Sequence, residues 1–223
     1  MPDATGLLLH FVRCNAPPRF DAWRRWLEEI HLPGLRAIEG VRAATHWALE
    51  VQPEPGMPSV GFTHLIVLEI CEALALTAER LRLHEDASRN SDRIDRSHCV
   101  IAQDRLRAHG RWRNKAMPTP QLEGHILAYV MCNDPRREAE WDRWNDDVHM
   151  PDMLGSGAFT GLSRWERDPR AERGTNHVTL YDVGEGGVRS AVARSAAVMP
   201  GLVEAGRKHE AHVGGLTITL VRP

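Results

Sequence analysis

One stretch of this chain occurs twice. Trp23–Trp26, followed by His31, returns 118 positions later as Trp141–Trp144, followed by His149. Further pairs keep this spacing, or a spacing of 113 after a short deletion: Cys14 and Cys132, Asn15 and Asn133, Pro17 and Pro135, Arg19 and Arg137, Trp47 and Trp165, and His64 and His177. Because tryptophan is rare and three tryptophans coincide, we conclude that two copies of one module fill the chain.

The length of the chain fits two domains. A chain of 223 residues allows one large domain or two of roughly 110 residues, since typical domains have about 100 to 150. The repeat favours two domains. Residues 114–121 are polar and contain prolines, which disfavours a continuous helix or strand there. We therefore expect one module over residues 1–115 and a second over residues 122–223.

Composition limits the partners of the chain. Hydrophobic residues make up 42% of it and the net charge is −2, which is typical of soluble globular proteins and gives no basic excess for nucleic acid or an anionic membrane. No apolar run reaches the roughly 18 residues of a membrane span, and no signal-peptide pattern opens the chain. The four cysteines show no CxxC spacing, which favours packing roles. We therefore expect a cytoplasmic protein that binds neither nucleic acid nor membrane.

The two halves begin with the same predicted elements. Short apolar runs that end at turn residues predict strands at Leu7–Cys14 and His125–Cys132. Apolar residues at helical spacing predict helices that run to His31 and His149. The prolines at positions 33 and 151 push the residues before them away from helical conformation, so each helix is expected to end there. The two histidines would then lie in the last helical turn.

The remaining elements complete a β-α-β-β-α-β order in each half. Second and third strands are predicted at Val41–Val51, Phe62–Ile70, Phe159–Asp168 and His177–Val183. Further helices are predicted at Glu72–Leu83, Ser91–Gln103, Gly187–Ala197 and Leu202–His209, and final strands at Arg105–Arg113 and Leu216–Val221.

This order predicts an α+β fold made of two tandem ferredoxin-like modules. Helices are expected to cover one face of each sheet. The other face is apolar and needs a cover, because large apolar surfaces are not left open to water. We therefore expect the sheets of the two modules to pack face to face as an α+β barrel.

The histidines at the predicted helix ends are candidates for proton transfer. A helix C-terminus favours an imidazolium by roughly 0.3 to 2 kcal/mol, so His31 or His149 could donate a proton near neutral pH. Glu28 and Asp146 come three residues earlier and would support the charged ring. The alternative is structural, with the histidine and proline forming a helix stop in which the ring bonds a backbone carbonyl.

The third strands suggest a pocket wall, because side chains alternate between the two faces of a strand. We expect one face to pack beneath the helices, with Leu65, Val67, Val178 and Leu180. We expect the other face to line a cavity between the sheets, with His64, Ile66, Leu68, His177, Thr179 and Tyr181. The same alternation places Tyr129 on an inward face. The alternative is that both tyrosines are ordinary half-buried strand residues.

Metal binding receives little support from the twelve histidines. None of them forms an HxH or HxxxH pattern. His209 and His212, three positions apart, make either a partial metal site or a solvated helix end. No metal site is therefore predicted, and the tryptophans are expected to form hydrophobic core.

The segment Trp141–Leu154 resembles the first helix of EthD-like proteins, which belong to the dimeric α+β barrel superfamily. The resemblance rests on an aromatic helix followed by His149, Pro151 and a hydrophobic residue. Phe20–Leu35 matches less closely, because Gly34 stands in place of an acidic residue. The resemblance implies a barrel of two ferredoxin-like modules, within one chain or in a homodimer. It names no single reaction, because the superfamily includes monooxygenases, cyclases, isomerases, dehydratases and haem enzymes.

We expect an enzyme that acts on a hydrophobic carbonyl or aromatic small molecule by general acid/base chemistry, as an isomerase, lyase or cyclase and without a cofactor. The polar side chains of the second half motivate this hypothesis. The predicted catalytic residues are His149, His177, Tyr129 and Tyr181, and the predicted substrate-binding residues are His31, His64, Trp144, Thr179 and Asp146. The alternatives are a cofactor-independent monooxygenase of a hydroxyaromatic compound and a non-catalytic ligand-binding accessory protein.

Overall fold

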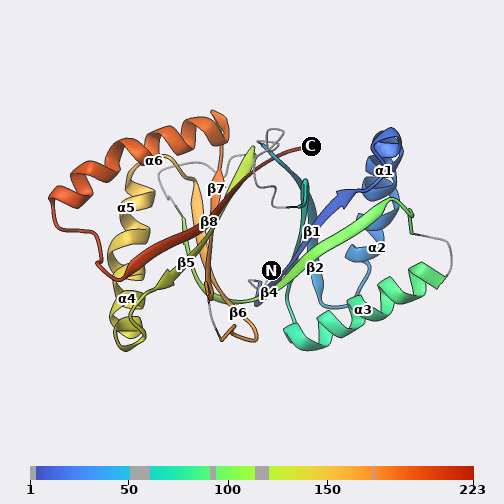
Figure 1. Ribbon diagram of the computed structural model, residues 1–223, viewed down its shortest axis with the longest axis horizontal. Helices are drawn as coiled ribbons and strands as arrows, with labels where there is room; N and C mark the ends of the chain where they lie inside the picture. Colours follow the sequence, from blue (N-terminus) through green and yellow to red (C-terminus); the bar gives the residue numbers. More distant parts are fainter. Residues whose placement is uncertain (1–3, 51–60, 91–93, 114–120, 173) are drawn as a thin grey trace. The chain divides into compact units, whose positions relative to one another are not determined.

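A computed structural model describes residues 4–50, 61–90, 94–113, 121–172 and 174–223. The chain divides into two compact units, Met1–Ala108 with Pro223, and His109–Arg222. In each unit an antiparallel sheet carries its helices on one face (Figure 1). The predicted connector at residues 114–121 lies, except for its last residue, outside the described residues.

The first unit follows the order β-α-β-β-α-β. Its elements are β1 (Gly6–Cys14), the 3-10 turn η1 (Pro17–Arg19), α1 (Phe20–Trp26), the π-helical segment η2 (Leu27–His31), α2 (Leu32–Arg36), β2 (Val41–Leu49), β3 (His64–Ile70), α3 (Leu74–Asn90) and β4 (His98–Arg113). Its strands lie in the order β4-β1-β3-β2, and neighbouring strands are antiparallel. This order, with the first and third strands in the centre, is that of a ferredoxin-like module.

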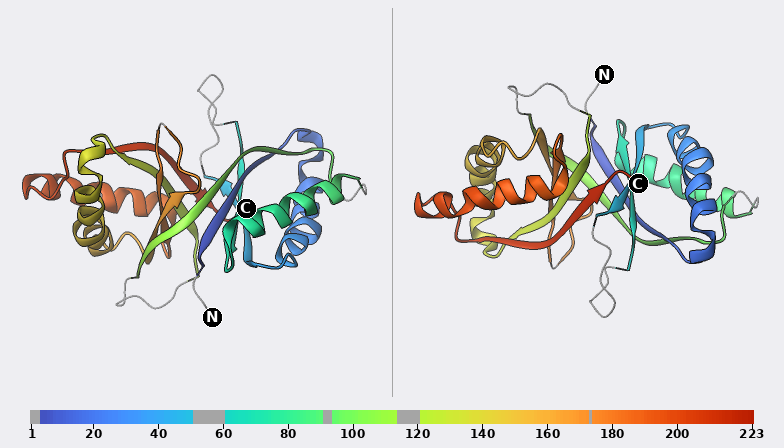
Figure 2. Two further views of the ribbon diagram at one scale, coloured as in Figure 1. Left: turned by 90° about the horizontal axis from the view of Figure 1, so that it is seen from below. Right: turned by 90° about the horizontal axis from the view of Figure 1, so that it is seen from above.

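The second unit repeats the first. Its elements are β5 (Gly124–Cys132), the 3-10 turn η3 (Pro135–Arg137), α4 (Glu138–Trp144), the π-helical segment η4 (Asn145–His149), α5 (Met150–Gly155), β6 (Gly161–Arg167), β7 (His177–Val183), α6 (Gly187–Glu204) and β8 (His212–Val221). Its strand order is β8-β5-β7-β6. In each unit the long helix, α3 or α6, lies on the same side of the sheet as the shorter helices (Figure 2). The predicted α+β class with two tandem ferredoxin-like modules is confirmed.

In each module the structure has one long helix, α3 or α6, in the part of the chain where the sequence predicted two helices. Of the described residues between β3 and β4, those of α3 are helical, and residues 98–103 belong to β4, where they pair with β1. Strand pairing satisfies the backbone groups along β1, which outweighs the local helical spacing. The other helix, α6, continues through Pro200, because one proline removes a single hydrogen bond from a helix that is held against the sheet. None of the described helices is long and apolar enough to cross a membrane.

The helices cover the opposite strand face to the one predicted. In β3, Ile66 and Leu68 belong to one buried cluster with Trp23 of α1. In β7, Tyr181 packs in a buried cluster with Met153 of α5. The prediction that the alternate residues pack beneath the helices was wrong; these are Leu65, Val67, Val178 and Leu180. Both faces of these strands are rich in apolar residues, so hydropathy alone does not distinguish them.

Gly6 and Gly124 are equivalent positions at which the first strand of each module approaches its neighbours closely. A Cβ at Gly124 would lie 2.3 Å from the carbonyl oxygen of Leu220, whereas a Cβ at Gly6 would lie 3.0 Å from that of Leu106 and 2.9 Å from the side chain of Leu74. Overpacking typically costs about 1–3 kcal/mol. We therefore expect Gly124→Ala to lower the free energy of unfolding by at least that much, and Gly6→Ala by less. Urea unfolding of the two variants measures the difference, and equal losses would contradict it.

Candidate functional site

Each module holds a cluster of tryptophan and histidine rings between its first helix and its sheet. In the first module, Trp23 is fully buried and its Nε1 donates a hydrogen bond of 3.2 Å to Nδ1 of His98. His31 stacks on Trp26 with ring centroids 4.8 Å apart. The ring of His64 meets Trp23 edge to face at 5.1 Å. We call these five residues the first ring cluster.

The second module repeats these contacts. Trp141 is fully buried, and its Nε1 donates a hydrogen bond of 3.2 Å to Nδ1 of His212. His149 stacks on Trp144 with centroids 4.9 Å apart, and the ring of His177 lies 4.7 Å from that of Trp141. These five residues form the second ring cluster. The tryptophans and histidines that repeat in the sequence therefore pack against one another in both modules.

The helices do not end before the prolines. The N–H of Leu32 bonds to the carbonyl of Leu27, one residue further back than in an α-helix, and the second module has the same π turn. A π turn widens the helix, so the following proline is accommodated near the start of the next α-helical segment. His31 and His149 therefore lie inside helices. The prediction that they occupy a helix C-terminus, with its dipole, was wrong.

Burial keeps five imidazoles of the ring clusters neutral at pH 7. It lowers the pKa of His31 to about 3 and that of His149 to about 4, and neighbouring imidazoles add to the effect. Burial likewise lowers the pKa of His64, His98 and His212 to about 4. The predicted imidazolium is therefore wrong, and these rings act as neutral hydrogen-bonding groups that can accept a proton.

Glu28 and Asp146 do not support the helix histidines. Oε1 of Glu28 lies 4.0 Å from Nδ1 of His46 on β2. Asp146 forms an ion pair with the buried Arg164 and lies 3.4 Å from Nε2 of His109. The predicted support of the charged rings was wrong, because a π turn has more residues per turn and separates positions that are three residues apart.

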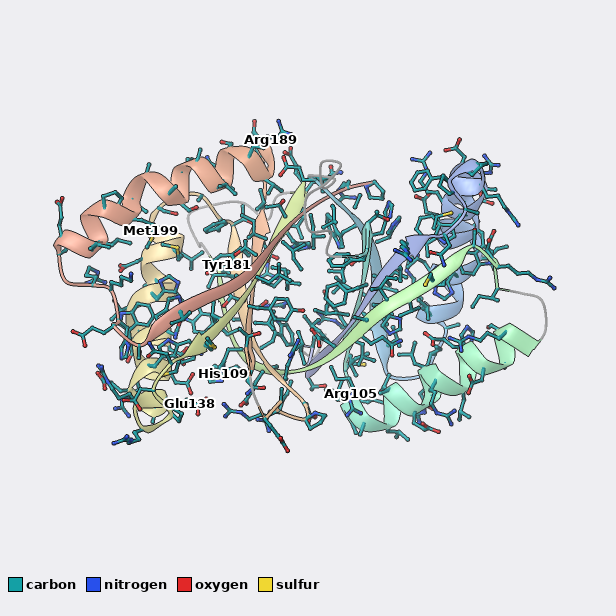
Figure 3. All side chains as sticks on the ribbon, in the orientation of Figure 1. Arg105, His109, Glu138, Tyr181, Arg189 and Met199 are labelled. Atoms are coloured by element: carbon teal, nitrogen blue, oxygen red, sulfur yellow. The ribbon has the colours of Figure 1, made fainter. Side chains whose placement is uncertain are left out.

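The predicted pair of tyrosines is divided between the two faces of the second sheet. Tyr181, Thr179 and His177 alternate along the helix-facing side of β7, and Figure 3 shows Tyr181 toward the helices. Tyr129 lies on the opposite face, where the guanidinium of Arg167 sits 5.4 Å from the centre of its ring. Burial raises the pKa of Tyr181 to about 12. The structure therefore brings His177, Thr179 and Tyr181 to one face, but not Tyr129.

A cavity of about 500 Å³ lies beside the first ring cluster. Its lining consists of Cys14, Pro17, Phe20, Arg24, Ala48, Thr63, His64 and Pro223, and we call it the first-module hollow. Nδ1 of His64 shares a hydrogen bond of 2.9 Å with the hydroxyl of Thr63, and its ring lies 5.5 Å from that of Phe20. The volume is within the range of about 300–1,000 Å³ that small-molecule sites occupy.

Arg24 is the lining residue that the sequence analysis missed. Among the described residues it has no carboxylate partner. After burial, its charge is a further cause that lowers the pKa of His64 and His46. The repeat contained a signal for it, because the equivalent position of the second module is Asp142, a reversal of charge.

In the second module, charged side chains of the protein pair with one another at the equivalent place. Glu138 and Glu166 stand where Phe20 and Ala48 line the first-module hollow. Arg170 forms ion pairs with both carboxylates, 3.0 Å from Oε1 of Glu166. Glu138 lies at the start of α4 (Figure 3). Burial alone would raise the pKa of Glu138, but hydrogen bonds from Arg170 and a neighbouring histidine hold it below the usual value.

His209 and His212 both pack against Trp144, with ring centroids 5.4 and 5.2 Å from that of the indole. Nε2 of His209 lies 3.4 Å from Oε1 of Glu140, and its Nδ1 accepts a hydrogen bond of 3.1 Å from the N–H of Ala211. His212 belongs to the second ring cluster. The predicted solvated helix end was wrong, because His209 is buried. Within the described ranges, no three histidine, cysteine or carboxylate side chains are grouped to hold a metal ion.

No protein-family model and no curated protein matches this chain. Solved structures match at low sequence identity. Chlorite dismutase from Candidatus Nitrospira defluvii has a TM-score of 0.60 and 6% identity, over 100% of this chain and 94% of its own. DypB from Rhodococcus jostii RHA1, solved with haem, has a TM-score of 0.56 and 7% identity, over 100% and 94%. A candidate monooxygenase from Fusobacterium nucleatum has a TM-score of 0.56 and 10% identity, over 97% and 90%.

These structures share the fold of this chain, so they support the α+β fold predicted from the sequence. At such identities the likeness shows the fold alone, and one fold carries many reactions. The resemblance of Trp141–Leu154 to EthD-like proteins stays a prediction.

Proposed function

We propose that this chain is an enzyme that moves a proton on a hydrophobic carbonyl or aromatic small molecule, with His64 as general base in the first-module hollow. One observation carries the proposal: an imidazole that is neutral at pH 7 borders a cavity of small-molecule size. Histidine is the side chain that most often acts as a general base. Isomerase, lyase and cyclase reactions on carbonyl compounds can all begin with removal of a proton.

Thr63 orients this base. When Nδ1 of His64 donates its hydrogen to the hydroxyl of Thr63, Nε2 carries the lone pair. Among the described residues no other hydrogen bond is made by His64. Nε2 can therefore take a proton from a carbon atom beside a carbonyl group, which leaves an enolate and an imidazolium. The imidazolium then returns the proton to another atom of the same molecule or to its leaving group.

Haem has no place in this proposal. Within the described part of the chain, His31 and His46 have buried imidazole nitrogens without hydrogen-bond partners, and histidine is a common axial ligand of haem iron. The ring of Trp26 lies 4.8 Å from that of His31, and the ring of His64 lies 5.0 Å from that of His46. Both imidazoles are thus buried against neighbouring rings, and the proposed proton transfer uses neither of them.

The catalytic roles predicted for residues of the second module stay proposals. His177 is held by Glu138, whose Oε1 lies 3.0 Å from its Nε2. This pairing would suit a second general base, and the EthD-like resemblance of the same module supports small-molecule chemistry there. Tyr129 lies on the other sheet face, so it would act apart from His149, His177 and Tyr181.

We expect His64→Gln to slow proton removal by about 100- to 10,000-fold, the usual contribution of a general base. Deuterium uptake from D2O into a panel of enolisable aryl ketones, followed by proton NMR, measures this step without knowledge of the product. Glutamine keeps a hydrogen-bonding group near Thr63, and circular dichroism checks that the variant folds. Exchange at the wild-type rate in His64→Gln would remove this residue from the mechanism. The same assay on His177→Gln tests the second module.

The two rival functions give other results. A cofactor-independent monooxygenase would consume oxygen with a hydroxyaromatic compound and no added flavin or metal. An accessory protein would retain a ligand during purification and release it unchanged. Either result, together with no deuterium exchange in the wild type, would replace the proposal.

A further inference from the structure

We infer that the first-module hollow binds an organic carboxylate with an apolar body through the guanidinium of Arg24. This inference rests on the proposed function and names its substrate class. The argument comes from the internal repeat, because the second module shows what fills the equivalent place when the lining has the opposite charge.

The two linings differ mainly in charge. Among the side chains that line the first-module hollow, Arg24 is the one cation, and none is a carboxylate. The second module has three carboxylates at equivalent positions, Glu138, Asp142 and Glu166. The paired histidines and the two cysteines at the strand ends are common to both modules. The two modules therefore share these histidines and cysteines, whereas the charge of the surrounding side chains is reversed.

In the second module, an arginine of the chain itself binds to the acidic side chains. Arg170 reaches back to Glu138 and Glu166, and its guanidinium completes both ion pairs. The next residue, Ala171, is fixed by two hydrogen bonds with the side chain of Asn176, of 2.7 and 3.0 Å. An acidic place is thus filled by a planar cation. By the same electrostatic argument, a place lined by a guanidinium selects a planar anion.

The strand residues beside the two sites, on β2 and on β6, also differ in charge. In the second module, Asp142 pairs with Arg164 of β6 at 2.7 Å, so that its charge is satisfied within the protein. The equivalent pair of the first module is Arg24 and His46, and His46 is neutral at pH 7. Among the residues that the structure describes, neither imidazole nitrogen of His46 has a hydrogen-bond partner. The first module therefore presents a cation that an external anion can satisfy.

The rest of the hollow fits an apolar body. Phe20 is 36% exposed and lines the hollow with Pro17 and Ala48. Such side chains favour an aromatic ring or a branched hydrocarbon. A carboxylate beside Arg24 would also offset the charge that opposes protonation of His64. The bound anion would thus raise the pKa of the base that acts on it.

Binding of benzoate and of its neutral analogue benzamide tests the inference. We expect wild-type protein at pH 7 to bind benzoate more tightly than benzamide in isothermal titration calorimetry. We expect Arg24→Gln to weaken benzoate binding about 10- to 100-fold, which corresponds to a charge-assisted hydrogen bond, and to leave benzamide binding unchanged. Arg25→Gln is the matched control, since it removes a neighbouring exposed arginine that does not line the hollow. Equal affinities for benzoate and benzamide, or an equal loss in Arg25→Gln, would overturn the inference.

A charge-reversed variant provides a second, independent measurement. We expect Arg24→Glu to lose benzoate binding and to gain binding of benzylammonium, as the acidic place of the second module accepts Arg170. NMR titration of the wild type should also show that benzoate raises the pKa of His64. Absence of both effects would overturn the inference. If Arg24 governs binding but His64→Gln keeps full exchange activity, the proposed function fails and the anion site stands. If His64→Gln loses exchange activity while Arg24→Gln leaves the affinity for benzoate unchanged, the proposed function stands and the anion site fails.

Discussion

The first module is expected to unfold between about pH 6 and pH 4, at a higher pH than the second. It contains four buried histidines, His10, His31, His46 and His64. Burial lowers the pKa of these residues to about 4, 3, 3 and 4. The pKa of partly buried histidines is also lowered to about 4, at His98 in the first module and at His149 and His212 in the second.

The sign of this effect follows from proton binding. The unfolded chain protonates its histidines near pH 6.5, whereas the folded first module protonates them only at about pH 3 to 4. Between these pH values the unfolded state binds more protons than the folded state. The free energy of unfolding is therefore highest above pH 6.5 and decreases as the pH falls through this range. For His10 alone the loss approaches about 3 kcal/mol, and whole domains have only about 5–15 kcal/mol. Glu85, 3.5 Å from His10, opposes the loss because burial raises its pKa, but it is a single group.

Hydrogen exchange measured by mass spectrometry, corrected for the intrinsic rate at each pH, follows the two modules separately. We expect peptides of β1 and β3 to lose protection at a higher pH than peptides of β5 and β7. His10→Gln removes one titrating group and keeps an amide near Gln103, so we expect its transition at a lower pH than that of the wild type. A first module that stays protected to pH 3, or a transition that His10→Gln leaves in place, would contradict the linkage.

The second large effect is expected from the buried tryptophans. We expect Trp23→Ala and Trp141→Ala each to lower the free energy of unfolding by about 3–5 kcal/mol, because both side chains are fully buried. Trp141→Ala should be the more harmful, since the guanidinium of Arg164 lies 5.4 Å from the centre of the Trp141 ring and would lose a cation–π contact. Urea unfolding followed by circular dichroism measures both losses.

Two milder variants separate packing from hydrogen bonding. Trp23→Phe keeps an aromatic ring but leaves Nδ1 of His98 without its donor, which we expect to cost about 1–3 kcal/mol. Ile30→Ala is the control, because this side chain follows in the next helical turn but is 55% exposed. A loss below 1 kcal/mol in Trp23→Ala, or a similar loss in Ile30→Ala, would show that the ring cluster does not stabilise the module.

The local elements that could be predicted are those in which one physical signal dominates. The strand His177–Val183 was predicted with its observed bounds, because apolar alternation and flanking turn residues agree there. The stretch after α3 has helical spacing, yet its residues 98–103 form a strand, since the free edge of β1 supplies hydrogen-bond partners that lie far away in the sequence. The helix stop at Pro33 failed because a π turn accommodates the proline at small cost.

The sequence identified residues that the structure brings together, and the roles predicted for them stay predictions. His31, His64 and Trp144 were identified from the repeat, and all three belong to the ring clusters. Arg24 was missed because a single exposed arginine on an amphipathic helix looks like any solvated charge. Its importance becomes visible only beside the cavity and its acidic counterpart, Asp142.

The sequence by itself determined that the chain is two copies of one β-α-β-β-α-β module. The spacing of tryptophan and histidine and the periodicity of apolar residues depend only on the order of residues along the chain. It could not determine which strand face meets the helices, because both faces of β3 and β7 carry apolar side chains. Only the tertiary structure decided that His64 and His177 face the helices, and that Arg24 lines a hollow in the first module whereas Arg170 pairs with Glu138 and Glu166 in the second. Those outcomes depend on contacts between distant residues, which no local pattern encodes.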